Sequence, residues 1–273
     1  MEVSHKMENK KIVFFDIDGT LINIPSGMNE ISQETKRVIQ EFKKAGHLVV
    51  IASARVTLPK NLKTLDIDGF IGSDGHYIIF NNQVILEDAF TQEQIELQMK
   101  LYKKHNAEYL FGGLQGSWVS DLDVPIVIYQ RELYAGTKEK PEGVPEKWSS
   151  NEVKAISATP LFENKEDLYN CLNELPNDWS IEAYDTGLIR MDVRLPGFSK
   201  GTACQFLFKK LGIPFENTYA FGDGKNDIEM LTLVKHGIAM GNADVVVKNA
   251  ASDITDSVEN EGIAKAFKKY FNI

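Results

Sequence analysis

The segment Ile12-Val13-Phe14-Phe15-Asp16-Ile17-Asp18-Gly19-Thr20 places two carboxylates directly after four consecutive apolar residues. A continuous apolar run of this kind is typical of a strand buried on both faces of a parallel sheet. Open α/β sheets bind their ligands at the carboxyl ends of such strands. Asp16 and Asp18 therefore stand where a functional site is expected, and Gly19 permits the tight turn that follows.

Both ends of the chain extend this pattern. Residues 32–45 have the periodicity of a helix with Ser32 as its N-cap, and a second buried-type strand follows at residues 48–52. This strand-helix-strand order favours a right-handed parallel crossover. Further elements are expected near the C-terminus, with helices at 201–211, 226–234 and 261–270 and strands at 218–221 and 237–240. The two ends together predict an α/β fold with a doubly wound, Rossmann-like parallel-sheet core.

The middle of the chain has a different pattern. Two helices, at residues 91–105 and 163–175, are mixed there with short strands, which is typical of an α+β arrangement. The length of 273 residues allows about two domains at roughly 150 residues each. We expect a core formed by residues 1–83 and 190–273, enclosing an inserted α+β domain at residues 84–189. The short strands expected in the insertion are 108–111, 154–158 and 180–184.

Composition limits the classes of partner. The chain has 30 Lys and Arg against 39 Asp and Glu, and its net charge of −9 disfavours nucleic acid and anionic membrane surfaces. No segment approaches the about 18 to 20 apolar residues that a membrane span needs. Cys171 and Cys204 lie far apart in helical patterns, which argues against a disulfide and fits a reducing cytoplasm. We expect a cytoplasmic protein, a monomer or homodimer, whose partner is a small molecule.

A second acidic group follows a later strand. Gly222-Asp223-Gly224-Lys225-Asn226-Asp227 comes directly after residues 218–221, so four acids are expected at one edge of the sheet. Clustered carboxylates repel one another unless a cation neutralises them, and Mg²⁺ prefers oxygen ligands. Lys200 opens a predicted helix, and Ser53 ends the second strand beside Arg55. A metal together with a lysine would allow a carboxylate to attack a phosphate.

Taken together, Asp16-x-Asp18-Gly19-Thr20, Ser53, Lys200 and Gly222-Asp223-x-x-x-Asp227 resemble the four motifs of the haloacid dehalogenase (HAD) superfamily. The resemblance spans nearly the whole chain. The large insertion resembles that of the Cof-like phosphatases, whose cap domain closes over small phosphorylated metabolites. The resemblance implies a Mg²⁺-dependent phosphatase that hydrolyses small phosphomonoesters through an aspartyl-phosphate, with sugar phosphates as the leading substrate class.

The resemblance also implies a role for each matching residue. Asp16 would be the nucleophile, and Asp18 the general acid that protonates the leaving oxygen and then activates water. Asp16, the backbone carbonyl of Asp18 and the side chain of Asp223 would hold Mg²⁺. Ser53 would contact the transferring phosphoryl group, and Lys200 would pair with that group and with Asp16. The implied substrate-binding residues are Ser53, Arg55, Lys200 and Asn226, and Asp227 would support Lys200 or the metal site.

Two positions depart from the pattern of this subgroup. Ala54 stands in Ala52-Ser53-Ala54-Arg55, where Thr-Gly-Arg is common, and Asp74 stands in Gly72-Ser73-Asp74-Gly75-His76, where Ser-Asn-Gly is usual. Asp74 would add a negative charge near the expected substrate entrance. Such a charge would disfavour strongly anionic substrates unless it is paired.

Other stretches with similar residues have simpler interpretations. Asp66-Ile67-Asp68-Gly69 repeats the Asp-x-Asp-Gly pattern, but no apolar strand precedes it, so we expect a loop there. A predicted strand would lead from the insertion back to the core, and along it alternate Arg190, Asp192 and Arg194. Their side chains are further candidates to reach the cleft that we expect between the core and the insertion.

Two alternative functions stay open. The first is a phosphomutase of the phosphomannomutase type, which resembles this architecture and uses the same paired aspartates. It would need a sugar diphosphate activator and would conserve phosphate ester, whereas a phosphatase releases phosphate. The second is a metabolite-binding module without catalysis. The presence of Asp16, Asp18, Lys200 and Asp223 argues against it, because binding alone needs neither a nucleophile nor an acid.

Overall fold

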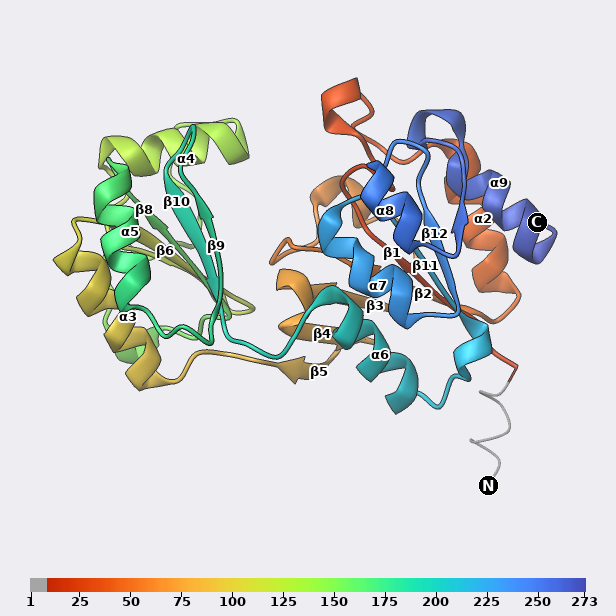
Figure 1. Ribbon diagram of the computed structural model, residues 1–273, viewed down its shortest axis with the longest axis horizontal. Helices are drawn as coiled ribbons and strands as arrows, with labels where there is room; N and C mark the ends of the chain where they lie inside the picture. The colour runs from red at the N-terminus through yellow and green to blue at the C-terminus, as the bar shows by residue number, and fades with distance from the viewer. Residues whose placement is uncertain (1–8) are drawn as a thin grey trace. The chain divides into compact units, whose positions relative to one another are not determined.

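The computed structural model describes residues 9–273, so the first eight residues of the predicted core segment lie outside the described residues. The chain folds into two compact units (Figure 1). The first consists of the chain up to Leu86 together with Phe198–Ile273, and the second consists of Glu87–Gly197. The first unit is built on an eight-stranded sheet and the second on a five-stranded sheet.

The larger sheet has the strand order β13-β12-β11-β1-β2-β3-β4-β5. Neighbouring strands from β13 to β3 are parallel, and β4 runs antiparallel to β3. The prediction of a doubly wound parallel-sheet core is confirmed. The strands are β1 (Ile12–Phe15), β2 (Leu48–Ala52), β3 (Gly69–Gly72), β4 (Tyr77–Phe80), β5 (Gln83–Glu87), β11 (Thr218–Gly222), β12 (His236–Ala239) and β13 (Asp253–Ile254).

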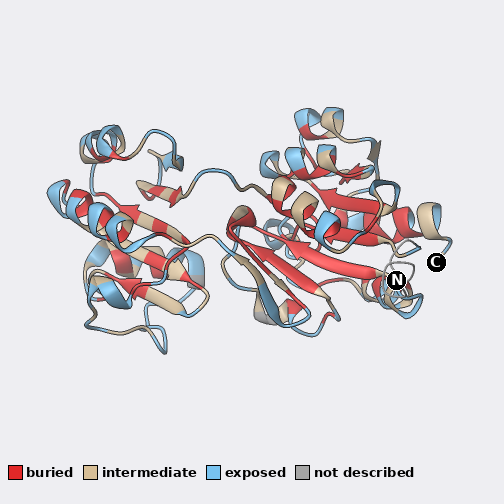
Figure 2. Cartoon of the chain, turned by 90° about the horizontal axis from the view of Figure 1, so that it is seen from below, coloured by how far each residue is buried: buried red, intermediate tan, exposed pale blue. Residues whose placement is uncertain are grey.

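Helices cover both faces of the larger sheet, and its strands β1, β2, β3 and β11 are buried along their whole length (Figure 2). On one face, Phe14 belongs to a hydrophobic cluster with residues of α6 (Lys200–Lys210) and α7 (Ile228–Leu233). On the other face, Phe15 stacks on Phe267 of α9 (Gly262–Phe271), and Phe267 in turn meets Phe42 of α2 (Gln33–Lys44). The alternation of side chains along β1 thus supplies both cores.

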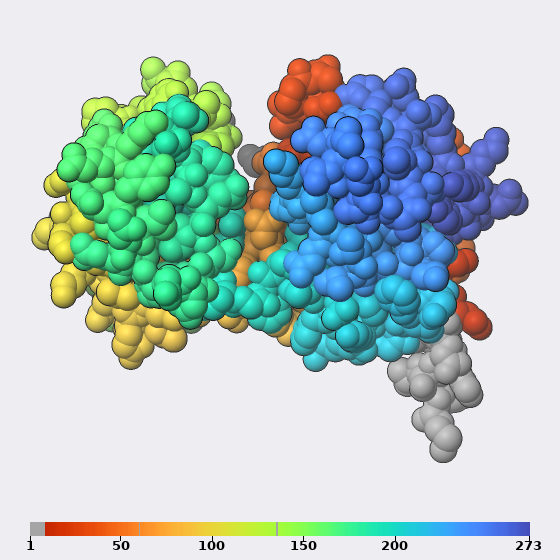
Figure 3. All heavy atoms as spheres, in the orientation of Figure 1, coloured from red at the N-terminus to blue at the C-terminus, as the bar shows by residue number. Residues whose placement is uncertain are grey.

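The C-terminal part of the chain completes this unit. Helix α8 (Val245–Ala250) packs against α7, and the last segments of the chain, blue in the space-filling view, form one side of the unit's surface (Figure 3).

Helix α2 begins at the predicted N-cap, because the Ser32 side chain accepts a hydrogen bond from the Thr35 N–H.

The second unit is an antiparallel sheet with helices packed on it. Its strand order is β7-β6-β8-β10-β9. Helices α3 (Gln92–Lys104) and α5 (Lys165–Glu174) share one hydrophobic cluster with the sheet, and α4 (Pro125–Ala135) packs in a second cluster. The strands are β6 (Glu108–Gly113), β7 (Gly116–Val119), β8 (Ser157–Leu161), β9 (Ser180–Tyr184) and β10 (Arg190–Arg194).

Several elements of the second unit differ from the sequence-based expectations. Strand β10 pairs antiparallel with β8 and β9, so Arg190, Asp192 and Arg194 belong to the inserted unit, which continues to Gly197. The expected boundary at residues 189 and 190 therefore falls inside this unit. The strand expected at 154–158 lies instead at Ser157–Leu161, and the expectations included neither β7 nor α4. Helix α4 contains an Ile-Val-Ile run that resembles a strand.

The remaining sequence-based expectations concern cysteines and membranes. Cys171 and Cys204 are both buried and free, which confirms that they do not form a disulfide. Burial raises the pKa of the Cys171 thiol to about 12, so little thiolate forms at neutral pH. Among residues 9–273, none of the helices combines the length and the apolarity that a membrane-spanning segment requires.

Replacement of Phe42 by alanine tests the packing between α2 and α9. The Phe42 ring is fully buried, and its centroid lies 5.4 Å from that of Phe267 and 4.7 Å from that of Phe271. We expect Phe42→Ala to lower the free energy of unfolding by about 3–5 kcal/mol, because the cavity cannot collapse fully. Phe215→Ala, at a site that is 45% exposed, should cost less than about 1 kcal/mol. Equal losses in urea denaturation would contradict this account of the packing.

Candidate active site

The candidate site lies at the carboxyl edge of the larger sheet. Strand β1 sits between β11 and β2, so the order of strands along the chain reverses around it. Ligand sites in open α/β sheets occur at this kind of switch point. Asp16 directly follows β1, Ser53 follows β2, and Asp223 follows β11. Three loops therefore bring polar side chains to one edge, as the sequence predicts.

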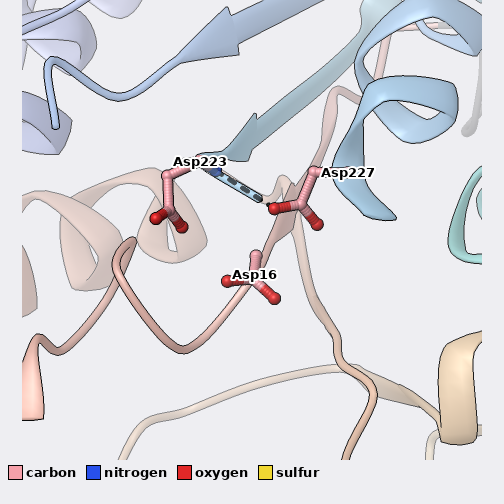
Figure 4. Close-up of side chains that lie close together, drawn as sticks. All are labelled: Asp16, Asp223 and Asp227. Carbon is pink, nitrogen blue, oxygen red and sulfur yellow. Dashed lines mark hydrogen bonds between the residues drawn. The ribbon is translucent and has the colours of Figure 1, made fainter. Parts of the chain in front are cut away.

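Three carboxylates converge there. Asp16, Asp223 and Asp227 point toward one another (Figure 4), and one oxygen of each lies within 4.8 Å of the others. The Asp227 Oδ2 accepts hydrogen bonds from the backbone N–H groups of Asp223 (3.1 Å) and Gly224 (2.9 Å). These bonds fix the Asp227 carboxylate against the loop that follows β11.

A buried lysine joins two of these carboxylates. The Lys200 Nζ donates to Asp16 Oδ1 at 2.5 Å and to Asp227 Oδ1 at 2.7 Å. Its side chain is only 1% exposed, so the ammonium group is almost completely removed from water. Lys200 is the first residue of α6, whose N-cap Ser199 accepts a hydrogen bond from the Thr202 N–H. The start of this helix therefore sets the position of the lysine beside Asp16.

The cluster holds more negative charge than one lysine neutralises. Burial raises the pKa of Asp16 well above its usual range, against the opposing effect of Lys200, and the neighbouring Asp227 adds to the increase. Burial and Asp227 also raise the pKa of Asp223 to about 6. Burial alone would lower the pKa of Lys200, but Asp16 and Asp227 together raise it above its usual value. A divalent cation at these oxygen donors would relieve the excess charge, so the residues present fit a metal such as Mg²⁺.

The side chain of Asp18 lies outside this cluster. Both of its oxygens accept hydrogen bonds from Arg55, from Nε at 2.9 Å and from Nη2 at 2.8 Å. The two side chains are about half exposed, at 50% for Asp18 and 41% for Arg55. The pairing raises the pKa of Arg55, which stays charged. The metal role that the resemblance gives to Asp18 uses its backbone carbonyl, so the position of its side chain leaves that prediction unchanged.

Ser53, Asn226 and Asp74 lie on loops of the same edge. Ser53 is buried, and its Oγ accepts a hydrogen bond from the Arg55 N–H at 3.2 Å. The Asn226 Nδ2 donates to Asp74 Oδ1 at 3.2 Å. The Asp74 N–H donates to the Ser53 carbonyl at 3.0 Å. Asp74, which departs from the subgroup pattern, thus links the loops after β2, β3 and β11.

Two residues of the site received no role in the sequence analysis. The Thr20 Oγ1 donates to Asp223 Oδ1 at 3.2 Å. Asn242 follows β12, and its Nδ2 donates to the Gly19 carbonyl at 2.8 Å and to Asp223 Oδ2 at 3.4 Å. The rule that places Asp16 and Asp223 at carboxyl ends of parallel strands also applies to Asn242, and could have identified it.

The two aspartates of the second Asp-x-Asp-Gly copy lie in a loop, as expected, and its Gly69 opens β3. The Asp68 carboxylate accepts hydrogen bonds from the Val49 N–H at 2.8 Å and from Lys43 Nζ at 2.7 Å. Asp66 lies 3.3 Å from the same lysine. These contacts join β2, α2 and the loop, which is a structural role.

Comparison with known proteins agrees with this geometry. The family model described as haloacid dehalogenase-like hydrolase matches residues 13–267. The chain is 28% identical to 5-amino-6-(5-phospho-D-ribitylamino)uracil phosphatase YcsE of Bacillus subtilis, over 99% of each chain. It is 30% identical to phosphoglycolate phosphatase of Methanothermobacter thermautotrophicus, over 95% of this chain and 98% of that one. A solved structure described as a sugar phosphatase of HAD subclass IIB aligns with a TM-score of 0.76 and 28% identity, covering 97% of this chain and 100% of the other.

A pair of glycine substitutions tests the close approach of Gly19 to Asp223. Gly19 and Gly27 have nearly the same left-handed φ, +86° and +84°, so alanine should cost about 1 kcal/mol of backbone strain at either position. A Cβ at Gly19 would overlap Asp223 Oδ2, whereas nothing lies within 4 Å of a Cβ at Gly27. Gly19→Ala must therefore displace the Asp223 carboxylate.

We expect Gly19→Ala to reduce the rate of phosphate release from an aryl phosphate by at least about 100-fold, the effect of a displacement of about 1 Å at a reacting centre. Gly27→Ala should keep nearly full activity. The melting temperatures of the two variants should be similar. Equal activities would contradict the proposed contact between Gly19 and Asp223.

Proposed function

The chain belongs to the haloacid dehalogenase-like hydrolases and is a phosphatase, and on that basis we propose that it transfers a phosphoryl group from a small phosphomonoester to Asp16 with the help of Mg²⁺. The main support for this proposal is the position of Asp16. Its carboxylate lies at the switch point of the sheet and is bonded to the ammonium group of Lys200. A carboxylate attacks a phosphate only where the charges of both groups are screened, and Lys200 supplies part of that screening.

The hydrogen bonds of the cluster favour two of its carboxylates as metal ligands. Asp227 is the most fully engaged of the three, because its Oδ1 accepts from the Lys200 ammonium and its Oδ2 from two backbone N–H groups. Each Asp223 oxygen accepts a hydrogen bond from one neutral donor only, which leaves lone pairs for a cation. We therefore assign Asp16 and Asp223 as the side chains that hold the metal, with the Asp18 carbonyl as the backbone ligand, and Asp227 as a support. When bound, Mg²⁺ neutralises charge on the carboxylates and on the phosphoryl oxygens.

The reaction then has two steps. In the first, an Asp16 oxygen forms a bond to phosphorus while the bond from phosphorus to the leaving oxygen breaks, and Asp18 donates a proton to that oxygen. In the second, Asp18 accepts a proton from water as the water oxygen bonds to phosphorus and the bond between phosphorus and the Asp16 oxygen breaks, which restores the Asp16 carboxylate and releases inorganic phosphate. Ser53, Arg55, Lys200 and Asn226 are the residues that we assign to the phosphoryl group.

We propose sugar phosphates as the leading class of substrate. The solved sugar phosphatase structure supports this choice, although the curated relatives act, by their names, on a ribitylaminouracil phosphate and on phosphoglycolate. By the same resemblance, we assign substrate selection to the inserted unit, Glu87–Gly197. We further propose that the enzyme works in the cytoplasm as a monomer or homodimer.

Phosphate release from p-nitrophenyl phosphate, with Mg²⁺ or with EDTA, tests the proposed function. We expect release that requires the metal, and we expect Asp16→Asn to lower kcat by at least about a thousandfold, as loss of a nucleophile does. Asp66→Asn is the matched control, because it makes the same change in the second Asp-x-Asp-Gly copy at a side chain that is 71% exposed. This control should keep full activity.

Release that persists in EDTA would contradict the role of the metal, and an unchanged rate in Asp16→Asn would contradict the role of the nucleophile. Phosphoryl transfer that occurs only with a sugar diphosphate activator, and without net phosphate release, would identify a phosphomutase instead.

A further inference from the structure

The loop after β12 brings an amide side chain to the candidate site. Asn242 lies in this loop, and its Nδ2 donates to the Gly19 carbonyl at 2.8 Å and to Asp223 Oδ2 at 3.4 Å. Gly19 belongs to the loop after β1, which also carries Asp16, and Asp223 belongs to the loop after β11. One side chain therefore contacts both loops from which we assign the metal ligands.

Asn242 is itself held in place from its other side. Its Oδ1 accepts a hydrogen bond from the Val258 N–H at 3.2 Å, at the start of the 3-10 helix Val258–Asn260. The preceding residue is also fixed, because the Gly241 N–H donates to the Asp256 carbonyl at 3.0 Å. The amide oxygen thus faces the segment 256–260, and the amide nitrogen faces the site.

The Asp223 carboxylate is oriented by two neutral donors. Thr20 Oγ1 donates to Oδ1 at 3.2 Å, and Asn242 Nδ2 is the donor to Oδ2. A hydroxyl and an amide fix the direction of the carboxylate without adding a positive charge that would compete with a metal ion. Such partners of metal-binding side chains typically change metal affinity 10- to 100-fold when they are removed.

We propose that Asn242 is a positioning residue that sets the metal affinity of the site by holding the Gly19 carbonyl and the Asp223 carboxylate in register. This inference rests on the proposed function, since it concerns the same metal site. Asn242 does not touch the reacting atoms. Its contribution is to fix the distance between the loop after β1 and the loop after β11. Asp16 and Asp223, which lie on these loops, can bind one cation only if that distance is maintained.

The structure distinguishes this role from a purely structural one. Asn242 is an exposed residue, so its removal leaves no buried cavity and should cost little stability. Its structural bond, to the Val258 N–H, uses only the amide oxygen. The amide nitrogen is directed entirely to the two loops of the site. Loss of the side chain should therefore affect metal binding more than folding.

The test compares Asn242→Ala with Asn260→Ala. Asn260 is an exposed asparagine at the end of the 3-10 helix Val258–Asn260, whose first residue bonds to Asn242. The Asn260 Nδ2 donates to Ser257 Oγ and not to the carboxylates of the site. For each variant and the native chain, we would measure the Mg²⁺ concentration that gives half-maximal phosphate release, KM for p-nitrophenyl phosphate at saturating Mg²⁺, and the melting temperature with EDTA and with Mg²⁺.

We expect Asn242→Ala to raise the half-saturating Mg²⁺ concentration about 10- to 100-fold, with KM for the aryl phosphate within about twofold of the native value. In the absence of substrate, at a Mg²⁺ concentration about 100 times the native Kd, a tenfold weaker site retains only about half of the stabilisation by the metal. The melting temperature in EDTA should fall by no more than about 4 °C. Asn260→Ala should behave as the native chain in all of these measurements.

The inference is overturned if the half-saturating Mg²⁺ concentration and the Mg²⁺-induced shift in melting temperature are both unchanged in Asn242→Ala. It is also overturned if KM and the melting temperature in EDTA change as much as the metal dependence does, because that pattern indicates a general distortion. A native chain whose activity and melting temperature do not respond to Mg²⁺ would instead contradict the proposed function.

Discussion

A buried ammonium group between two buried carboxylates is the interaction on which the site depends. Lys200 bonds to Asp16 and to Asp227, and these three residues come from the start of α6, the end of β1 and the loop after β11. Removing one partner of such a buried set typically costs about 3–5 kcal/mol, because the remaining charges stay uncompensated. The order β11-β1-β2 in the sheet and the position of α6 against it must therefore be correct before the site can form. The fold and the candidate active site therefore depend on the same ion pairs, those of Lys200 with Asp16 and Asp227.

The same constraint explains how charge is distributed around the site. Lys200 neutralises part of the acidic cluster, and the excess negative charge that remains favours a divalent cation. The neutral donors Thr20 and Asn242 then orient Asp223 without adding charge. Asp18 is hydrogen-bonded to Arg55, so the expected acid has a different cationic partner from the expected nucleophile. The arrangement gives each carboxylate a different environment, and hence allows each a different role.

Strands β1, β2, β11 and β12 of the larger sheet, but not β3, β4, β5 or β13, and the positions of the main acids could be predicted from sequence. The apolar run before Asp16 marks a buried strand, and the carboxyl-end rule places Asp16, Ser53 and Asp223 at one edge. Pairings between side chains could not be predicted in this way. The bonds from Arg55 to Asp18 and from Asn226 to Asp74 depend on loop geometry, which periodicity does not encode. The prediction assigned the residues of β10 to the core, whereas the strand belongs to the inserted unit. The alternating sequence pattern of a half-buried antiparallel strand is the same at the end of an insertion as at the start of a core.

If Asp16 accepts the phosphoryl group, the phosphorylated form of the protein should be detectable. Asp18→Asn should slow the second step, because the base that activates water is missing, so we would incubate this variant with an aryl phosphate and Mg²⁺ and measure the intact protein by mass spectrometry after acid quenching. We expect a gain of one phosphoryl group, mapped by peptide analysis to Asp16 and absent when Asp16 is also changed to Asn. A phosphoryl group on another residue, or phosphate release that continues in the Asp16→Asn variant, would contradict it.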